Sequence, residues 1–193
     1  YFTDHEKLLA ILAIADKIKI TSKAAVAALQ KKGIEVYLLT GDNQHTAQAV
    51  ANQVGIKLFK AEVLPSDKAD FVKQLQGQGK VVAMVGDGIN DAPALAKATI
   101  GISMNDASQI AMQSAQVVLM NHGLKKLPMA LGLGKHTYLT IKQNLFWAFA
   151  YNIVAIPVAA LGFLKPGFAA LVMGLSDVVL AINSGRLYVK KVD

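Results

Sequence analysis

A run of twenty residues, Leu145 to Leu164, contains no charged side chain and reads LFWAFAYNIVAIPVAALGFL. A helix of about 20 apolar residues is long enough to cross the hydrocarbon core of a bilayer, which is about 30 Å thick. A second apolar stretch, 168–183, follows a Lys-Pro-Gly turn, and its one charged residue is Asp177. This pattern predicts a hairpin of two transmembrane helices, at about 145–164 and 168–185.

Basic residues gather at the two outer ends of the predicted hairpin. Lys165 alone lies between the apolar stretches, whereas the flanking segments contain Lys125, Lys126, Lys135, Lys142, Arg186, Lys190 and Lys191. Since cytoplasmic segments are enriched in Lys and Arg, we expect an integral protein of the plasma (inner) membrane. Its soluble part and its C-terminus would lie in the cytoplasm.

The composition excludes some other classes of protein. The formal net charge is +7, but the lysines of the soluble part are scattered, which argues against nucleic acid as a partner. The chain has no cysteine, so it can form neither disulfides nor thiolate metal sites of its own.

Residues 1–127 alternate between strand and helix patterns. Apolar β-type runs at 34–40 and 80–85 each precede or follow helical patterns such as 43–54. This alternation predicts an α/β fold, with a Rossmann-like parallel sheet and helices on its faces. We therefore expect an α/β part-domain at 1–127. Residues 128–193 would form a linking helix and the two transmembrane helices.

Two carboxylates, Asp87 and Asp91, follow the strand predicted at 80–85, within the sequence VGDGINDAP. The carboxyl ends of parallel strands are where such folds bind ligands. Magnesium is usually bound by one or two carboxylates together with water and phosphate oxygens. Asn90 can donate to an oxygen ligand or hold Asp91 in place. The motif therefore favours a Mg²⁺ site, although the same residues could simply form a turn and a helix cap.

A second set of residues suits a phosphoryl group. Thr40, Gly41 and Asp42 follow the strand predicted at 34–40 and precede a helix, so they offer a hydroxyl and backbone N–H groups to an anion. Lys68 supplies a point charge suited to phosphoryl oxygens. Taken singly, these residues are ordinary caps and an ordinary surface lysine. Their order along one α/β chain makes them a candidate set.

Together these motifs resemble the phosphorylation domain of P-type ATPases, which are ion pumps built on a haloacid dehalogenase-like fold. The matching residues are TGDN from Thr40, AEVLPSDK from Ala61 and MVGDGINDAPALA from Met84. The stretches Asn144–Ala160 and MGLSDVVLAINSGRL from Met173 resemble membrane helices of the heavy-metal pumps, of the copper or silver type. The resemblance covers nearly the whole chain and assigns it to the C-terminal part of such a pump.

The resemblance implies a role for each matching residue. Asp87 would be the principal Mg²⁺ ligand, and Asp91 would support the ion. Thr40 and Lys68 would be the catalytic residues that hold the transferred phosphoryl group. The other phosphate-binding residues would be Gly41, Asp42 and Asn90.

The path of the transported metal would be lined by Tyr151 and Asn152 from the first apolar helix and by Met173 and Asp177 from the second. A Met thioether suits soft Cu(I) or Ag(I), although Met also fills apolar gaps freely. Asp177 stands where the copper-type helix usually has Ser or Thr. Because carboxylates prefer harder ions, Asp177 leaves the identity of the metal open.

One motif of the family is absent from this chain. The pumps phosphorylate the Asp of an Asp-Lys-Thr-Gly-Thr motif, which would precede residue 1, as would the domain that binds ATP. We therefore expect the chain to be inactive alone and to act in heavy-metal export with the N-terminal part of the pump as its partner. The alternatives are a membrane-anchored remnant or accessory subunit without catalysis, and a haloacid dehalogenase-type phosphatase. The phosphatase would need a nucleophile near Asp16-Lys17, where the Thr of the motif is missing.

Overall fold

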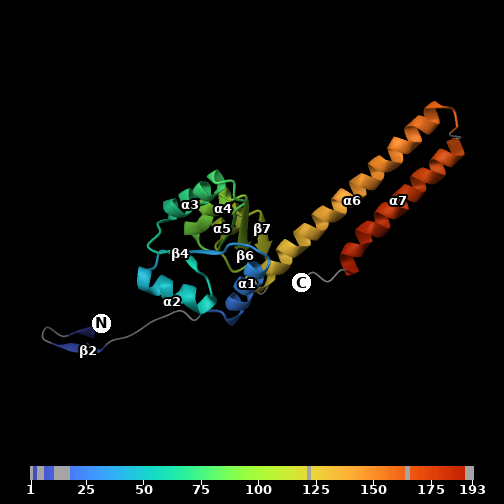
Figure 1. The fold of residues 1–193 in the computed structure, drawn as a ribbon. Helices are drawn as coiled ribbons and strands as arrows, with labels where there is room; N and C mark the ends of the chain where they lie inside the picture. Colours follow the sequence, from blue (N-terminus) through green and yellow to red (C-terminus); the bar gives the residue numbers. More distant parts are fainter. Residues whose placement is uncertain (1, 4–6, 11–17, 121–122, 164–165, 190–193) are drawn as a thin grey trace. The chain divides into compact units, whose positions relative to one another are not determined.

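The computed structural model describes residues 2–3, 7–10, 18–120, 123–163 and 166–189. The chain divides into two compact units, Tyr1–Lys125 and Lys126–Asp193. The described strands all belong to the first unit, and the second unit contains two long helices (Figure 1).

Parallel strands form the centre of the first unit. In the described residues, β3 pairs with β4, and a separate sheet has the order β5-β6-β7. A short antiparallel pair, β1 and β2, lies near the N-terminus. The strands are β1 (Phe2–Thr3), β2 (Leu8–Ala10), β3 (Tyr37–Leu39), β4 (Leu58–Lys60), β5 (Ala83–Gly86), β6 (Ile100–Met104) and β7 (Val117–Leu119). The predicted parallel α/β fold is confirmed.

Helices connect these strands, as parallel pairing requires. They are α1 (Ile20–Lys31), α2 (Gln44–Val54), α3 (Pro65–Gly77), α4 (Ala92–Lys97) and α5 (Gln109–Ser114), with 3₁₀ turns η1 (Ile89–Asp91) and η2 (Gly123–Lys126). The start of α2 is fixed by Asn43, whose Oδ1 accepts from the backbone N–H of Thr46 at 2.9 Å. Gly55, with φ of 81°, ends the same helix.

Two apolar clusters hold the helices against the strands. In the first, Val26 of α1 and Val54 of α2 pack with Leu38 of β3. In the second, Val72 of α3 and Ala94 of α4 pack with Met84 of β5. Because each cluster joins two helices to one sheet, it fixes the loops that follow β3 and β5.

The strands β3 and β5 each have an unpaired edge. In the described part of the chain, β3 pairs with β4 alone and β5 with β6 alone. The segments that precede the two strands are joined by an exposed ion pair between Glu35 and Lys80. The hydrogen bond from Lys80 lowers the pKa of the Glu35 carboxyl, and Glu35 in turn raises the pKa of Lys80.

The second unit is an antiparallel pair of helices, α6 (Leu127–Ala160) and α7 (Pro166–Val189) (Figure 1). Helix α6 unites most of the predicted linking helix with most of the uncharged run. Within the described residues, no helix combines the length and the apolar character that crossing a membrane requires. The predicted hairpin of two transmembrane helices is therefore not confirmed.

Candidate functional site

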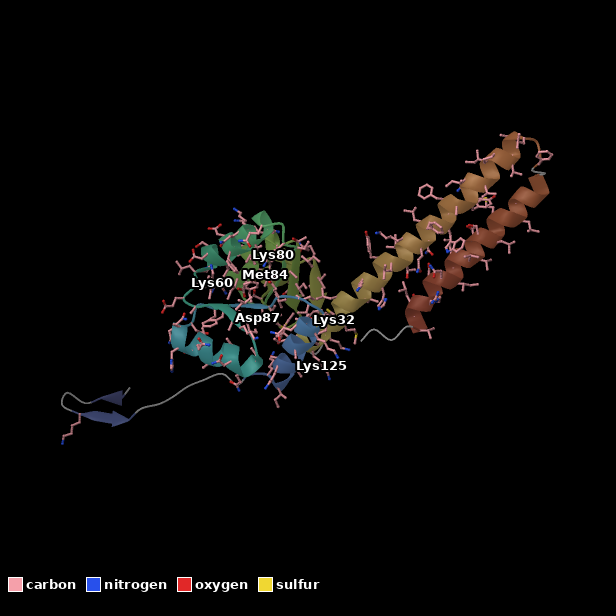
Figure 2. The ribbon with its side chains drawn as sticks, in the orientation of Figure 1. Lys32, Lys60, Lys80, Met84, Asp87 and Lys125 are labelled. Atoms are coloured by element: carbon pink, nitrogen blue, oxygen red, sulfur yellow. The ribbon has the colours of Figure 1, made fainter. Side chains whose placement is uncertain are left out.

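The predicted phosphoryl and Mg²⁺ residues follow the carboxyl ends of two strands. Thr40 comes directly after β3, and Asp87 comes directly after β5. Figure 2 shows Asp87 at the end of the strand that contains Met84. The structure therefore has Thr40 and Asp87 at the ends of strands, as the sequence predicted.

The loop after β3 is closed by its own side chains. The Thr40 hydroxyl donates to Asp42 Oδ2 at 2.7 Å and accepts from the Asp42 backbone N–H at 3.2 Å. Thr40 is half-buried, whereas Asp42 is exposed. The Asp42 carboxylate thus accepts the hydrogen bond that the Thr40 hydroxyl could otherwise donate to an anionic ligand.

The loop before α3 is bonded to the loop after β3. The Glu62 N–H donates to the Asp42 carbonyl at 2.8 Å, and the Val63 N–H donates to the Thr40 carbonyl at 3.0 Å. Glu62 has a φ of 55°, which is unusual for a residue with a side chain. Since these bonds fix the start of α3, they also fix Lys68 in its first turn.

Lys68 and Asp91 form an ion pair that joins α3 to η1. Lys68 Nζ lies 2.8 Å from Asp91 Oδ1, and the two side chains are only 14% and 13% exposed. The other oxygen, Asp91 Oδ2, accepts from the Gly88 N–H at 3.3 Å. Both oxygens of Asp91 therefore have partners within the protein. Sequence reasoning assigned these residues separately to phosphate and to Mg²⁺, and did not foresee that they would contact each other.

Gly86 makes room for the Asp91 side chain. A Cβ atom at position 86 would lie 2.6 Å from Asp91 Cβ and 2.9 Å from Asp91 Oδ2, closer than real Cβ contacts allow. The absence of a side chain at position 86 therefore lets the Asp91 carboxylate lie over the end of β5. This contact explains why the residue before Asp87 is a glycine.

Gly86→Ala is expected to lower the free energy of unfolding of the first unit by about 2 kcal/mol, because the new methyl group would displace Asp91. Amide hydrogen exchange of β5 and β6 in the full chain measures this change. Gly77→Ala is the matched control, since a Cβ atom there meets nothing within 4 Å. Equal effects of the two substitutions would contradict the role given to Gly86.

Asp87 fits a Mg²⁺ ligand better than Asp91 does. Its side chain is exposed and has no hydrogen-bond partner among the described residues, while its carbonyl accepts from the Ser108 N–H at 2.8 Å. The backbone of Asp87 is thus fixed and its carboxylate is free. Asn90 is also exposed and unpartnered in this part of the chain. Within the described residues, no three His, Asp or Glu side chains form a metal cluster.

The four residues predicted for the transported metal lie on α6 and α7. Tyr151 is half-buried, whereas Asn152 is exposed and donates its side-chain amide to the Ala148 carbonyl at 2.8 Å. Met173 is 62% exposed, and Asp177 is also exposed. No hydrogen bond joins any two of these four in the described chain. Their role stays a prediction.

Sequence reasoning missed a polar network between α6 and α7. Asn183 donates to Asn144 Oδ1 at 2.8 Å and to Gln143 Oε1 at 3.4 Å. Asn144 in turn donates to Ser184 Oγ at 2.9 Å. These residues lie at the outer ends of the two apolar stretches, which the sequence analysis considered only for their length. The available signal was a pair of adjacent polar residues at the outer end of each stretch, Gln143-Asn144 and Asn183-Ser184.

The fold and the site define the class to which this protein belongs. A family model described as haloacid dehalogenase-like hydrolase matches residues 1–99, and the chain belongs to this family. Within it, nearly the whole chain matches a portion of heavy-metal P-type ATPases, as the motifs indicated.

Three relatives illustrate the match. The chain is 49% identical over 187 residues to a probable copper-importing P-type ATPase A of Enterococcus hirae, which is 95% of this chain and 26% of that protein. It is also 49% identical over 180 residues to a copper-exporting P-type ATPase of Staphylococcus aureus, or 93% of this chain and 22% of that one. The crystal structure of a zinc-transporting PIB-type ATPase in its E2.Pi state matches with a TM-score of 0.83 and 34% identity, covering 89% of this chain and 28% of that chain. The chain thus spans about a quarter of the length of these relatives.

Proposed function

We propose that this chain supplies the phosphoryl and Mg²⁺ site, and part of the ion path, of an ATP-driven heavy-metal pump that exports copper or silver. The observation that carries the proposal is the largely buried Lys68–Asp91 ion pair, in the same Gly-Asp-Gly-Ile-Asn-Asp segment as the exposed carboxylate of Asp87. A lysine held in this way, together with an exposed carboxylate directly after β5, suits a site for both a phosphoryl group and its metal ion. The matches to P-type ATPases support the same function.

Each residue of the site has a distinct task in this proposal. Thr40 gives up its hydrogen bond to Asp42 and donates from its hydroxyl to a phosphoryl oxygen instead, and Gly41 offers its backbone N–H to the same group. Lys68 supplies the positive charge, and Asp91 orients it. Asn90 donates its amide. Asp87 is the direct Mg²⁺ ligand, and when bound, Mg²⁺ would neutralise charge on the phosphoryl oxygens. Asp91 already has one partner on each oxygen, Lys68 and the Gly88 N–H, so its first task is to hold the lysine.

The nucleophile would come from another segment of the pump. Both β3 and β5 have an unpaired edge in the described residues, and an unpaired edge can accept a further strand. A strand paired there would end near Thr40 and Asp87, where an Asp could receive the phosphoryl group of ATP. The proposed partner is therefore the segment of the pump that contains this Asp and the nucleotide-binding domain. ATP would bind to that segment and not to this chain.

The second unit would contribute to the path of the metal. We place α6 and α7 in the plasma (inner) membrane, with the first unit in the cytoplasm. The uncharged run Leu145–Leu164 and the basic residues outside it support this placement. Tyr151, Asn152, Met173 and Asp177 would act with ligands from other helices of the pump, since Met173 and Asp177 are exposed on the α6–α7 pair.

A phosphatase is the second candidate, because the family model is that of a hydrolase. It would need a nucleophile within this chain. The candidate segment for that role, Asp16-Lys17, lies outside the described residues. An accessory subunit without catalysis is the third candidate.

The test is aspartyl phosphorylation by ATP in membranes. The chain is expressed alone and together with the segment encoded immediately upstream of it. We expect a hydroxylamine-sensitive phosphoenzyme only when both segments are present, and more of it when Cu⁺ or Ag⁺ is added. Phosphate release from a phosphomonoester by the chain alone would favour the phosphatase. No phosphoenzyme in either case would favour the accessory subunit.

A further inference from the structure

A small cavity lies between α6 and α7, on the side of Tyr151 that faces the start of α6. Its volume is about 80 Å³, and its polar lining consists of His136, Thr140, Gln143, Asn183 and Arg186. Two leucines complete the wall. All of these residues belong to the second unit, so the cavity is separate from the phosphoryl site described above.

The cavity gathers hydrogen-bond donors. Among the described residues, the guanidinium of Arg186, the imidazole of His136 and the hydroxyl of Thr140 have no hydrogen-bond or ion-pair partner. Gln143 uses its oxygen to accept from Asn183, which leaves its amide N–H groups free to donate. No carboxylate lines the cavity. A group that enters it therefore meets several donors, one of them permanently positive.

The surrounding charge is also positive. No acidic residue occurs between Asp106 and Asp177 in the sequence, whereas α6 contains Lys135 and Lys142. Asp177 precedes Arg186 by nine residues, which is about 13 Å along a helix, so it does not neutralise the guanidinium. An anion would therefore be attracted to this part of the α6–α7 pair and would be bound there by directed donors.

We propose that this cavity binds one phosphate-bearing anion, which the Arg186 guanidinium holds against His136, Thr140 and Gln143. The small volume of the cavity limits the size of the ligand. A cavity of about 80 Å³ accepts a phosphate group but not a nucleotide. The network of Asn144, Asn183 and Ser184 fixes the two helices at this level, so the donors are held in place before the anion arrives.

Two sources can supply such an anion, an anionic lipid headgroup or inorganic phosphate. The test measures binding of phosphatidylglycerol to the full chain in neutral detergent micelles, by native mass spectrometry. We expect the chain to retain one phosphatidylglycerol molecule. Inorganic phosphate at millimolar concentration is then added as a competitor. If the lipid persists, the headgroup is the ligand. If phosphate displaces it, the same site takes the soluble anion.

Substitutions distinguish binding of an anion within the cavity from non-specific electrostatic attraction of anions to the helix pair. Arg186→Gln is expected to weaken binding about tenfold, since a charge-assisted bond to phosphate is lost, and Arg186→Lys to restore part of it. Lys142→Gln is the matched control. It removes one charge from the same helix pair, but Lys142 lies over the Tyr138 ring and not in the cavity. We expect less than a twofold effect there.

Two results would overturn the proposal. One is equal weakening by Arg186→Gln and Lys142→Gln, which would mean diffuse attraction of anions. The other is no binding of either probe by the unaltered chain. Circular dichroism of each variant verifies that the helices are intact, so a loss of binding is not mistaken for a loss of fold. Neither result bears on the phosphorylation test, because that test depends on residues of the other unit.

Discussion

Asp91→Asn is expected to lower the free energy of unfolding of the first unit by about 2 kcal/mol, because it leaves a largely buried ammonium without its counter-charge. Lys68 is only 14% exposed, and its ammonium lies 2.8 Å from the Asp91 carboxylate. Asparagine fills the same space over Gly86 but carries no negative charge. Amide hydrogen exchange of β5 and β6 in the full chain reports the loss.

The double variant Lys68→Met/Asp91→Asn separates charge from packing. Removing both charges is expected to recover at least half of the loss, since no unpaired charge then stays buried. Asp70→Asn is the control on the same helix as Lys68. Asp70 is 70% exposed and lies 4.0 Å from Lys73, and an exposed pair of this kind contributes less than about 1 kcal/mol. Similar losses for Asp91→Asn and Asp70→Asn would refute the importance of the buried pair.

Asp87→Asn is expected to reduce phosphoenzyme formation by about a thousandfold in the reconstituted pump, as loss of a group that stabilises transferred charge does. The same substitution should weaken Mg²⁺ binding at least about tenfold, because a neutral amide is a poorer ligand for a hard cation. Stability should hardly change, since the Asp87 carboxylate has no partner among the described residues. Phosphorylation at varied Mg²⁺ concentrations measures both effects.

Asp106→Asn is the matched control for Asp87. Asp106 follows β6 as Asp87 follows β5, is 68% exposed, and lies 3.4 Å from Lys19. If charge at this end of the sheet were all that mattered, both substitutions would reduce phosphorylation alike. We expect Asp106→Asn to leave phosphorylation within about twofold of the unaltered pump, as for an ordinary surface ion pair. A thousandfold loss in this control would contradict the role assigned to Asp87.

The sequence was sufficient for those parts of the site that depend on local order along the chain. Thr40 and Asp87 follow apolar β-type runs, and parallel strands present the residues after them at their carboxyl ends. The contact between Lys68 and Asp91 could not be predicted in this way. The two residues are 23 positions apart, and their contact depends on how α3 and α4 pack against β5.

In the second unit, too, the sequence predicted the helices but not the contacts between them. The apolar runs predicted helices, and the expected linking helix and first apolar helix form the single helix α6. Hydropathy did not indicate which polar side chains of α6 face α7. The network of Asn144, Asn183 and Ser184 depends on the alignment of two antiparallel helices. Spacing within a single helix contains no information about that alignment.

The length of α6 has a mechanical consequence. The helix is continuous from Leu127 to Ala160, so Leu127 and Tyr151 belong to one rod. At 1.5 Å per residue these two residues are about 36 Å apart along its axis. A continuous helix of this kind can transmit a rotation or displacement from Leu127 to Tyr151 without a chain of intermediate contacts. In the proposed function, the stiffness of this single helix would determine how closely a movement at Tyr151 follows a movement at Leu127.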